Sequence, residues 1–312
     1  MLSLVRKTFR HYRAFGLSST AKVAWQRFFP PPSEPSGPAN YGTVYANDAR
    51  IEADAQYALR IAKGYVSKLP GGIYGLKKKA VLELGPGLNL GTALLLRCWG
   101  AGEVAVADRF LVRFQPTYHP RLYRRLSELI RDDEYDADTE PFDKSATAGR
   151  HLERFLTLIE TPLERLGETA ALRFDLTLSN AVLEHVYHPL LAIRSLANIS
   201  RHGSLGLHQV DCRDHRDFSR PLEYLLLDEF SFHALLTDSH SECGNRIRPD
   251  ELMAMFGESG FADVQFMPNM WTDPDYLEQF MPRLRAARSS PYFDIEVERL
   301  RPISGLFKLT KN

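Results

Sequence analysis

The sequence predicts an α/β fold in which a mostly parallel sheet is covered by helices on both faces. Beyond Lys79, short apolar segments of strand length alternate with segments of helical periodicity, which is typical of such a sheet. One apolar segment runs into a Gly-Pro-Gly turn and then a helix, the usual start of a ligand site in open α/β sheets. The seven strand candidates are Ala80 to Leu84, Val104 to Ala107, Phe155 to Ile159, Leu176 to Ser179, Ser204 to Val210, Val264 to Met267 and Gly305 to Leu309.

The composition is that of an ordinary globular protein and narrows the choice of partners. Among 312 residues, Lys and Arg number 39, as do Asp and Glu, so no global attraction to nucleic acid is expected. The three cysteines are widely spaced and fit neither a disulfide framework nor a C-x-x-C knuckle, which favours a reducing compartment. No apolar run reaches the roughly 18 to 20 residues that span a bilayer. We therefore predict a cytoplasmic protein with a small-molecule partner.

Residues 1–40 are predicted to form an N-terminal extension. Residues 1–29 contain no acidic residue and place Val5, Phe9 and Tyr12 at helical spacing, which predicts a basic amphipathic helix. This helix could lie peripherally on an anionic membrane surface or dock on its own domain, and the sequence leaves both open. The run PPPSEPSGP then forms a Pro-rich linker.

Residues 41–312 are predicted to form one domain that opens with a helix. Asp48 is the expected N-cap of this helix, and apolar residues from Ile51 to Val66 form a single stripe. Two stretches are expected to be insertions, near residues 109–150 and 212–247. Within the first, the polar stretch of residues 131–149 is expected at the surface. The second is a crossover with many aromatic residues that could cover a ligand or simply pack as helices.

The stretch VLELGPGLNLGTALLL, residues 81–96, places a glycine-rich turn between a predicted strand and a predicted helix. A strand that ends in such a turn presents free backbone N–H groups, so Gly85 and Gly87 would let a ligand approach the main chain. Asp108 ends the next predicted strand, where an acid commonly holds a ribose. These features predict an adenosine-containing ligand. The dinucleotide fingerprint requires glycine at position 90, which is Leu90, so a pyrophosphate is disfavoured.

Three segments resemble one family. E-L-G-P-G-L-N-L-G resembles motif I of class I S-adenosylmethionine-dependent methyltransferases, and FDLTLSNAVLEHV, residues 174–186, resembles the fourth-strand motif of its small-molecule, type 11-like branch. GNRIRPDELMAMFGESGF, residues 244–261, resembles the late helix of that branch. The resemblance covers roughly residues 50 to 310. It implies a three-layer, Rossmann-like, doubly wound sheet of seven strands with an antiparallel last strand.

The resemblance also implies S-adenosylmethionine as the cofactor. Gly85 and Gly87 would line its methionine part with Glu83 nearby, and Asp108 would bind the ribose hydroxyls. Glu164, after the third strand, would lie near the adenine, although the preceding insertion blurs the register. The sulfonium group of this cofactor is cationic, so acidic residues around the pocket would favour its binding. The cofactor has no phosphate, so the loop needs no phosphate-binding backbone.

The resemblance places the acceptor beside the fourth and fifth strands. Asn180 would face the transferred methyl group. His185 and His215 are the candidate catalytic residues, because histidine titrates near neutral pH and can deprotonate a hydroxyl. For each of them, a structural role is the competing interpretation. His215 is favoured as a substrate contact because Asp211 and Asp214 lie close to it in sequence.

A metal site is not expected. Small-RNA ribose methyltransferases and some quinone-pathway O-methyltransferases have an E-x-x-E-H arrangement here, which forms part of a divalent-metal site. In this chain Ala181 stands where that pattern has its first acid. Glu184 and His185 alone are too few ligands. Glu184 is also favourable simply as an acid at a helix start.

The sequence thus predicts a methyltransferase that uses S-adenosylmethionine to methylate a small molecule at oxygen. The basic helix and the polar-aromatic crossover suggest a glycan or lipid-linked acceptor. An NAD(P)-dependent oxidoreductase is one alternative, disfavoured by Leu90 and by the FDLTLSNAVLEHV segment. A catalytically inactive interaction module is the other, and the intact Gly85, Gly87 and Asp108 argue against it.

Overall fold

The computed structural model describes residues 36–37, 40–41, 46–131, 133–150, 152–168, 173–238 and 242–312. The expected N-terminal basic helix lies outside these residues, as does most of the Pro-rich linker. Two short strands, β1 (Ser36–Gly37) and β2 (Asn40–Tyr41), form an antiparallel pair. No helix within the described ranges is long and apolar enough to cross a membrane.

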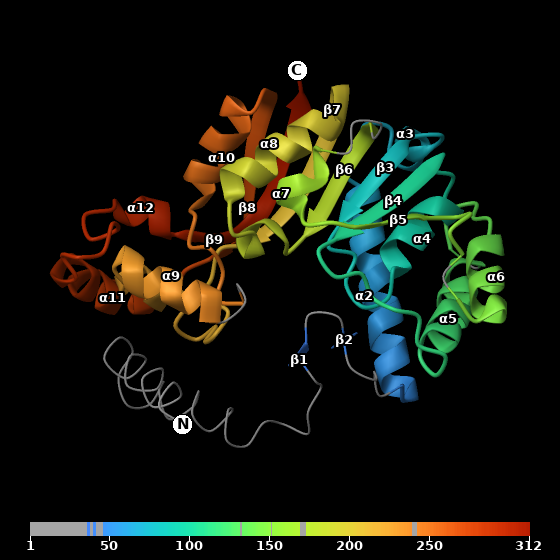
Figure 1. Cartoon of the computed structure of the whole chain (residues 1–312), viewed down its shortest axis with the longest axis horizontal. Helices are drawn as coiled ribbons and strands as arrows, with labels where there is room; N and C mark the ends of the chain where they lie inside the picture. The colour runs from blue at the N-terminus through green and yellow to red at the C-terminus, as the bar shows by residue number, and fades with distance from the viewer. Residues whose placement is uncertain are drawn as a thin grey trace.

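All seven predicted strands form, and they make one sheet in the order β5-β4-β3-β6-β7-β9-β8 (Figure 1). β9 lies between β7 and β8 and is antiparallel to both, whereas the remaining neighbours are parallel. The predicted antiparallel last strand is therefore confirmed. The strands are β3 (Ala80–Leu84), β4 (Glu103–Asp108), β5 (Thr157–Glu160), β6 (Phe174–Asn180), β7 (Ser200–Asp211), β8 (Phe261–Trp271) and β9 (Pro302–Lys311).

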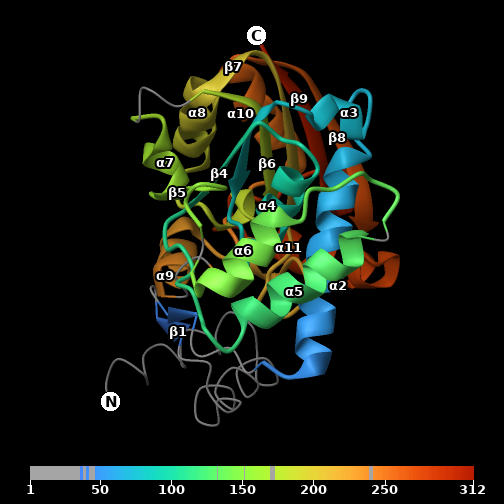
Figure 2. The same cartoon turned by 90° about the vertical axis from the view of Figure 1, so that its right-hand side faces the viewer.

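Helices cover the two faces of this sheet, as expected from strands that are apolar on both sides. Within β3, Val81 contributes to the cluster on one face and Leu82 to the cluster on the other, following the period of two in a strand. The first face carries α2 (Asp48–Val66), α4 (Gly91–Cys98), α5 (His119–Arg131) and α6 (Glu140–Ala148), with α3 (Ile73–Leu76) beside them (Figure 2). The second carries α7 (Leu163–Leu166), α8 (Pro189–Ile199) and α10 (Pro249–Glu258).

The helix expected after the linker is α2, with its apolar stripe buried. Its cap differs from the prediction. Asn47, and not Asp48, is the N-cap: its side-chain oxygen accepts a hydrogen bond from the backbone N–H of Arg50 at 2.7 Å. Asp48 is the first helical residue, where its negative charge still favours the helix N-terminus.

Residues 109–150, expected as an insertion with a polar surface stretch at residues 131–149, supply part of the core. This stretch connects β4 to β5 and contains α5 and α6. Tyr118, Tyr123 and Phe142 are completely buried in the cluster beneath the first face. This core role could not be read from the polar sequence around residues 131–149. A small number of large apolar side chains is enough to cover the edge of the sheet.

The crossover of residues 212–247 builds half of a separate helical lobe, which we define as η2 (Glu223–Leu226), α9 (Glu229–Asp238), α11 (Pro274–Ala286) and α12 (Val297–Leu300). These elements share a third apolar cluster. Figure 1 shows α9, α11 and α12 gathered beside the sheet. The buried carboxylate of Glu223 joins the two halves by accepting two hydrogen bonds from Arg283, at 2.8 and 2.6 Å. Both lobe segments leave the carboxyl ends of strands, one after β7 and one after β8.

A short segment before α10 fastens this lobe to the sheet. The side chain of Arg248 is completely buried and donates to the carbonyl of Cys212 at 2.8 Å and to that of Pro302 at 3.2 Å. These carbonyls mark the end of β7 and the start of β9. Arg246 donates to the carbonyl of Leu227, which follows η2 in the lobe, at 2.8 Å. A buried guanidinium that satisfies several carbonyls fixes their relative positions.

Replacing Arg248 by Met should reduce the free energy of unfolding by about 2 kcal/mol, because the apolar stem is kept while the carbonyl of Pro302 loses this donor and that of Cys212 keeps only Tyr224. Urea denaturation of the wild type and the variant measures this difference. Arg165→Met is the matched control, since its exposed ion pair with Glu168 should contribute less than about 1 kcal/mol. Equal losses in both variants would contradict the fastening role of Arg248.

Candidate functional site

The glycine-rich loop follows β3 at the carboxyl edge of the sheet. Gly85 and Gly87 have φ of +60° and +68°, values that L side chains rarely adopt. A Cβ on Gly85 would lie only 2.4 Å from Cγ2 of Val182, so this loop packs directly against the segment that follows β6. A Cβ on Gly87 would meet no atom within 4 Å among the described residues. The outer side of the loop at Gly87 therefore faces open space that a ligand can fill.

Side chains from α5 contact the backbone carbonyls of the glycine-rich loop. Nε2 of His119 lies 3.0 Å from the carbonyl oxygen of Leu88, and the hydroxyl of Tyr123 donates to the carbonyl of Asn89 at 3.0 Å. Burial lowers the pKa of His119 to about 4, so its ring is neutral at physiological pH. The segment expected as an insertion, residues 109–150, thus supports the candidate ligand site.

Two predicted acids flank the loop. Glu83 is almost completely buried, and burial raises its pKa to about 8 although the backbone of Ala93 in α4 hydrogen-bonds to it. Its Oε2 has no hydrogen-bond partner among the described residues. Asp108 ends β4, and its Oδ1 accepts a hydrogen bond from the backbone N–H of Phe110 at 3.0 Å. Burial also raises the pKa of Asp108.

Glu160 is an acid that the sequence analysis did not single out. It is the last residue of β5 and the register partner of Asp108, so the two acids end adjacent strands side by side. Glu164, the predicted adenine contact, follows β5 and lies on α7. Its Oε1 accepts a hydrogen bond from the backbone N–H of Tyr187 at 3.1 Å and lies 3.6 Å from Arg109. Recognising that β5 extends to residue 160 would have identified the adjacent acid.

Asn180 ends β6, as predicted, and its amide donates to the hydroxyl of Tyr57 on α2 at 2.7 Å. This bond links the sheet to the helix beside the glycine-rich loop. Beyond Asn180, residue Ala181 has a positive φ of 57°, which turns the chain sharply after the strand. The chain then enters η1 (Leu183–His185).

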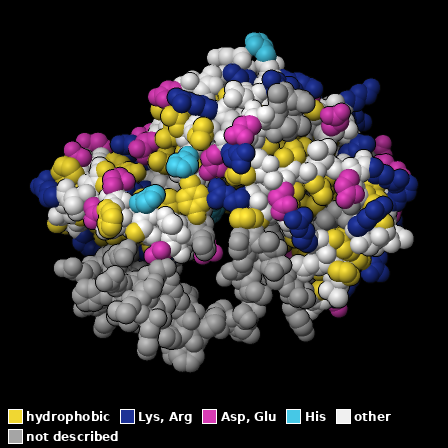
Figure 3. Space-filling model, in the orientation of Figure 1, with side chains coloured by type: hydrophobic (Ala, Val, Ile, Leu, Met, Phe, Trp, Pro, Cys, Tyr) yellow, Lys and Arg dark blue, Asp and Glu magenta, His cyan; other side chains and the backbone are white. Residues whose placement is uncertain are grey.

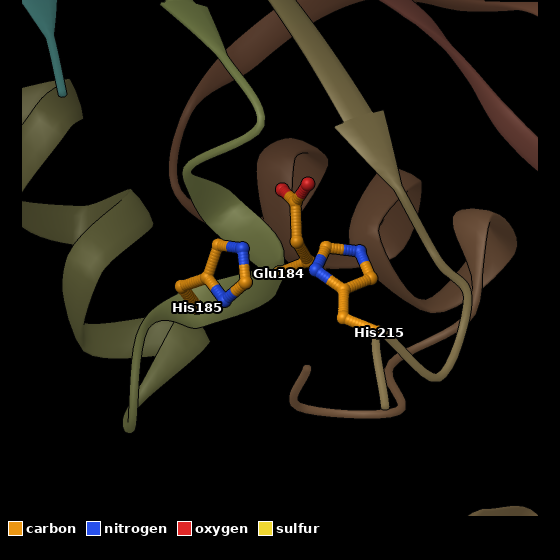
Figure 4. A group of neighbouring side chains, drawn as sticks. All are labelled: Glu184, His185 and His215. Carbon is orange, nitrogen blue, oxygen red and sulfur yellow. The ribbon is translucent and has the colours of Figure 1, made fainter. Parts of the chain in front are cut away.

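Glu184, His185 and His215 form a cluster at this turn (Figure 4). One potential ligand atom from each lies within 4.8 Å of the others. The two imidazole rings are 4.8 Å apart between centroids and are arranged edge to face. The structure therefore brings together the two predicted catalytic histidines, which come from η1 and from the segment after β7.

Asp211 sets the electrostatics on one side of this cluster. Its backbone N–H donates to Oε1 of Glu184 at 3.0 Å, and its carbonyl oxygen lies 3.3 Å from Nε2 of His215. Burial disfavours charge on Asp211, but hydrogen bonds from Arg213 and His215 outweigh it and lower the pKa of Asp211. Burial opposes protonation of His215, yet the hydrogen bond and negative charge of Asp211 raise its pKa.

Glu184 has the opposite environment. It is completely buried, and burial raises its pKa to about 8. Its Oε2 has no hydrogen-bond partner among the described residues. A buried carboxyl oxygen left without a partner is costly, so this site carries an unmet polar requirement.

Asn245 fixes the position of the turn that carries Glu184 and His185. Its backbone N–H donates to the carbonyl of Glu184 at 2.7 Å, and its side-chain amide donates to the carbonyls of Leu183 and Val186 at 2.7 and 3.2 Å. The residue is buried. It lies within the GNRIRPDE segment, and sequence analysis used that segment only as a family landmark.

His208, which the sequence placed in a strand, does not join the cluster. It is completely buried, with its ring nitrogens 2.9 Å from Oγ of Ser179 and 3.3 Å from Oγ1 of Thr177. Burial lowers its pKa to about 3. His208 is therefore a neutral residue of the core.

On the face seen in Figure 3, basic and acidic side chains are interspersed over the described surface.

The comparisons with known proteins find similar solved structures and no sequence relative. No protein-family profile matches the chain, and no curated protein matches it. A candidate sarcosine dimethylglycine methyltransferase from Galdieria sulphuraria is 12% identical, covers 84% of this chain and 87% of that one, and has a TM-score of 0.44.

Two further similar structures are methyltransferases. A SAM-dependent methyltransferase from Thermotoga maritima is 13% identical, with 85% and 94% of the two chains covered and a TM-score of 0.40. The N-methyltransferase NodS from Bradyrhizobium japonicum is 13% identical, with 86% and 93% covered and a TM-score of 0.38. At this level of similarity, the function has to be argued from this chain's own residues.

The buried carboxyl of Glu83 should make stability depend on pH. Folding raises its pKa from 4.5 to about 8, so the native state retains a proton that the unfolded chain loses in that interval. The contribution is fully present below the unfolded pKa and is lost as pH rises through the folded one, by at most about 1.4 kcal/mol per pH unit.

Urea unfolding of the wild type and Glu83→Gln across this interval tests the expectation. The variant should show a smaller decline in the free energy of unfolding with rising pH. Glu103→Gln, on the exposed end of β4, is the control and should leave the slope of the wild type unchanged. An unchanged slope in Glu83→Gln would contradict a neutral, buried Glu83.

Proposed function

We propose that this protein is a class I S-adenosylmethionine-dependent methyltransferase that acts on a small molecule. The observation that carries the proposal is the glycine-rich loop, open at Gly87 and flanked by the acids Glu83 and Asp108. Residues 83–91 contain no Lys or Arg. An open backbone with carboxyl oxygens around it and no basic side chain in the loop suits an adenosine ligand that carries a cation.

The residues of the site fit such a cofactor. The space beside Gly87 can admit its methionine part, and the unpartnered Oε2 of Glu83 is a buried polar atom that lacks a donor. Asp108 and Glu160, side by side at the ends of β4 and β5, supply acceptors for ribose and adenine groups. When bound, S-adenosylmethionine supplies a methyl group activated by a sulfonium.

Oxygen is the acceptor atom that the neighbouring cluster favours. In O-methylation the acceptor oxygen forms a bond to the methyl carbon as the sulfur–carbon bond breaks, and the hydroxyl proton must leave. Glu184 and His185 lie on the segment that packs against Gly85 through Val182, and His215 joins them from the segment after β7. This arrangement supports a role for the cluster in accepting or neutralising that proton. Alignment of the reactants would supply much of the remaining acceleration.

A sugar or another ring-shaped group is the acceptor that the surroundings of the cluster favour. Phe218 is 53% exposed, and its ring lies 5.3 Å from that of His215 and 4.2 Å from the guanidinium carbon of Arg213. An exposed aromatic ring beside a polar cluster can stack against such a group. This supports a glycan or lipid-linked acceptor.

The alternatives fit the loop less well. A dinucleotide pyrophosphate would approach a segment without basic residues and close to Glu83. Leu90 adopts a left-handed conformation with φ of +53° and is almost completely buried, where the fingerprint has its third glycine. An inactive interaction module would have no requirement for an open, strained loop with paired acids beside it.

Calorimetric titration of the full chain with S-adenosylhomocysteine, NADH and NADPH distinguishes these functions. We expect S-adenosylhomocysteine alone to bind, with a dissociation constant in the micromolar range. Binding of NADH or NADPH instead would favour the oxidoreductase, and absence of binding by all three would favour the inactive module. Methyl transfer would then be sought with a panel of hydroxylated glycans and lipid-linked sugars.

Gly87→Arg should abolish binding of S-adenosylhomocysteine without unfolding the protein, because the new side chain enters the open space beside the loop. The positive φ should add strain of about 1–2 kcal/mol. Gly203→Arg is a matched control: Gly203 also has a positive φ, of +73°, and open space around its Cβ position, but it lies near the start of β7. Retained affinity in Gly87→Arg would refute this site.

Asp108→Ala should weaken binding of S-adenosylhomocysteine at least tenfold, about 1.4 kcal/mol, since a ribose hydroxyl would lose its charged acceptor. The same titration measures it. Glu103→Ala, on the exposed start of the same strand, is the control and should bind as the wild type does. Equal affinity in the Asp108 variant and the control would remove Asp108 from the site.

A further inference from the structure

We propose that Glu184, His185 and His215 bind a divalent transition-metal ion of the zinc, manganese, iron or cobalt class. Two imidazoles and one carboxylate are a donor set that such ions prefer, whereas magnesium and calcium favour oxygen ligands. The sequence supplied only the adjacent pair, and the structure adds His215 from a segment about 30 residues away along the chain.

The distances within the cluster suit an ion. The three potential ligand atoms lie within 4.8 Å of one another in the described structure. Bonds of about 2.0–2.2 Å to one ion bring ligand atoms to about 3–3.6 Å apart. The largest separation that this limit allows exceeds the metal-bound range by about 1–2 Å, which is within the reach of side-chain rotation. The ligands come from two segments that packing already holds in place.

A second and independent observation is the unsatisfied oxygen of Glu184. The side chain is 3% exposed, and Oε1 accepts the backbone N–H of Asp211 at 3.0 Å. Oε2 has no hydrogen-bond partner among the described residues. A bound cation would satisfy this oxygen and remove the cost of its burial.

The second histidine has the outer contacts typical of a metal ligand. Nε2 of His215 lies 3.3 Å from the carbonyl oxygen of Asp211 and 3.7 Å from its Oδ2. Figure 4 shows the other ring nitrogen of His215 turned toward His185. Histidines that bind metals usually donate their second N–H to a carbonyl or carboxylate, which orients the ring. Asp211 is well placed for that role.

The nearby positive charges are neutralised by acids. Arg213 forms an ion pair with Asp211 at 2.6 Å, and Arg216 pairs with Asp214. Asn245 anchors the η1 turn through the backbone carbonyl of Glu184. The cluster is therefore preorganised and shielded from the closest guanidinium groups.

Three protein ligands leave coordination positions open, as in catalytic sites. An acceptor hydroxyl bound there would lose its proton more readily, because a coordinated ion lowers the pKa of bound oxygen. The hydroxyl would pass its proton to solvent. This catalytic role rests on the proposed methyltransferase function, whereas the binding of the ion does not.

The test uses the full chain, stripped of metal with a chelator and dialysed against Zn²⁺ or Co²⁺. We expect one ion per chain, measured by elemental analysis, and a visible Co²⁺ absorption spectrum typical of low coordination number. Glu184→Gln and His215→Asn should each weaken binding at least about 100-fold, since even outer contacts contribute about 10- to 100-fold. Circular dichroism establishes that the variants are folded.

His188→Asn is the matched control, because His188 is an exposed histidine close to His185 in sequence. It should bind the ion as the wild type does. Absence of stoichiometric binding by the wild type, or unchanged affinity in both ligand variants, would overturn the metal site. Titration of the same samples with S-adenosylhomocysteine separates the two proposals: cofactor binding without metal binding would reject only the metal site, and the reverse result would reject only the methyltransferase.

Discussion

The buried guanidinium of Arg248 is the constraint on which the carboxyl edge of this sheet depends. It binds carbonyls at the end of β7 and at the start of β9, and so fixes where both lobe segments leave the sheet. Asn245, three residues earlier, holds the η1 turn through three backbone contacts. One short segment therefore sets the separation between the sheet, the lobe and the cluster. A charged side chain can occupy this core because carbonyl oxygens surround it.

Much of the fold could be predicted from local patterns. The strands from Ala80 to Leu84 and from Leu176 to Ser179 stood out because parallel strands buried on both faces are continuously apolar. The core role of residues 109–150 was missed because this segment lacks such a continuous apolar run. Its helices bury only a few large aromatic residues within a polar sequence. Strand ends were the weakest predictions: the predicted end of β5 at Ile159 left out Glu160, the acid that lies opposite Asp108.

The candidate site was predictable where its residues follow a strand directly, as Gly85, Gly87 and Asp108 do. Contacts between distant segments could not be read from spacing. The approach of His215 to Glu184 requires the path of the chain after β7, and the anchoring by Asn245 requires the turn before α10. These contacts determine whether Glu184 and His185 are simply a helix start or two members of a three-residue cluster.

The position of β9 between β7 and β8 has a consequence for how specificity can change. Because β8 runs in the same direction as β7, two separate connections emerge at one edge and together build the helical lobe. The glycine-rich loop belongs to the opposite half of the sheet and shares none of these segments. Under the proposed function, recombination that exchanges both connections would change the acceptor preference while the half of the sheet that carries the glycine-rich loop is inherited unchanged.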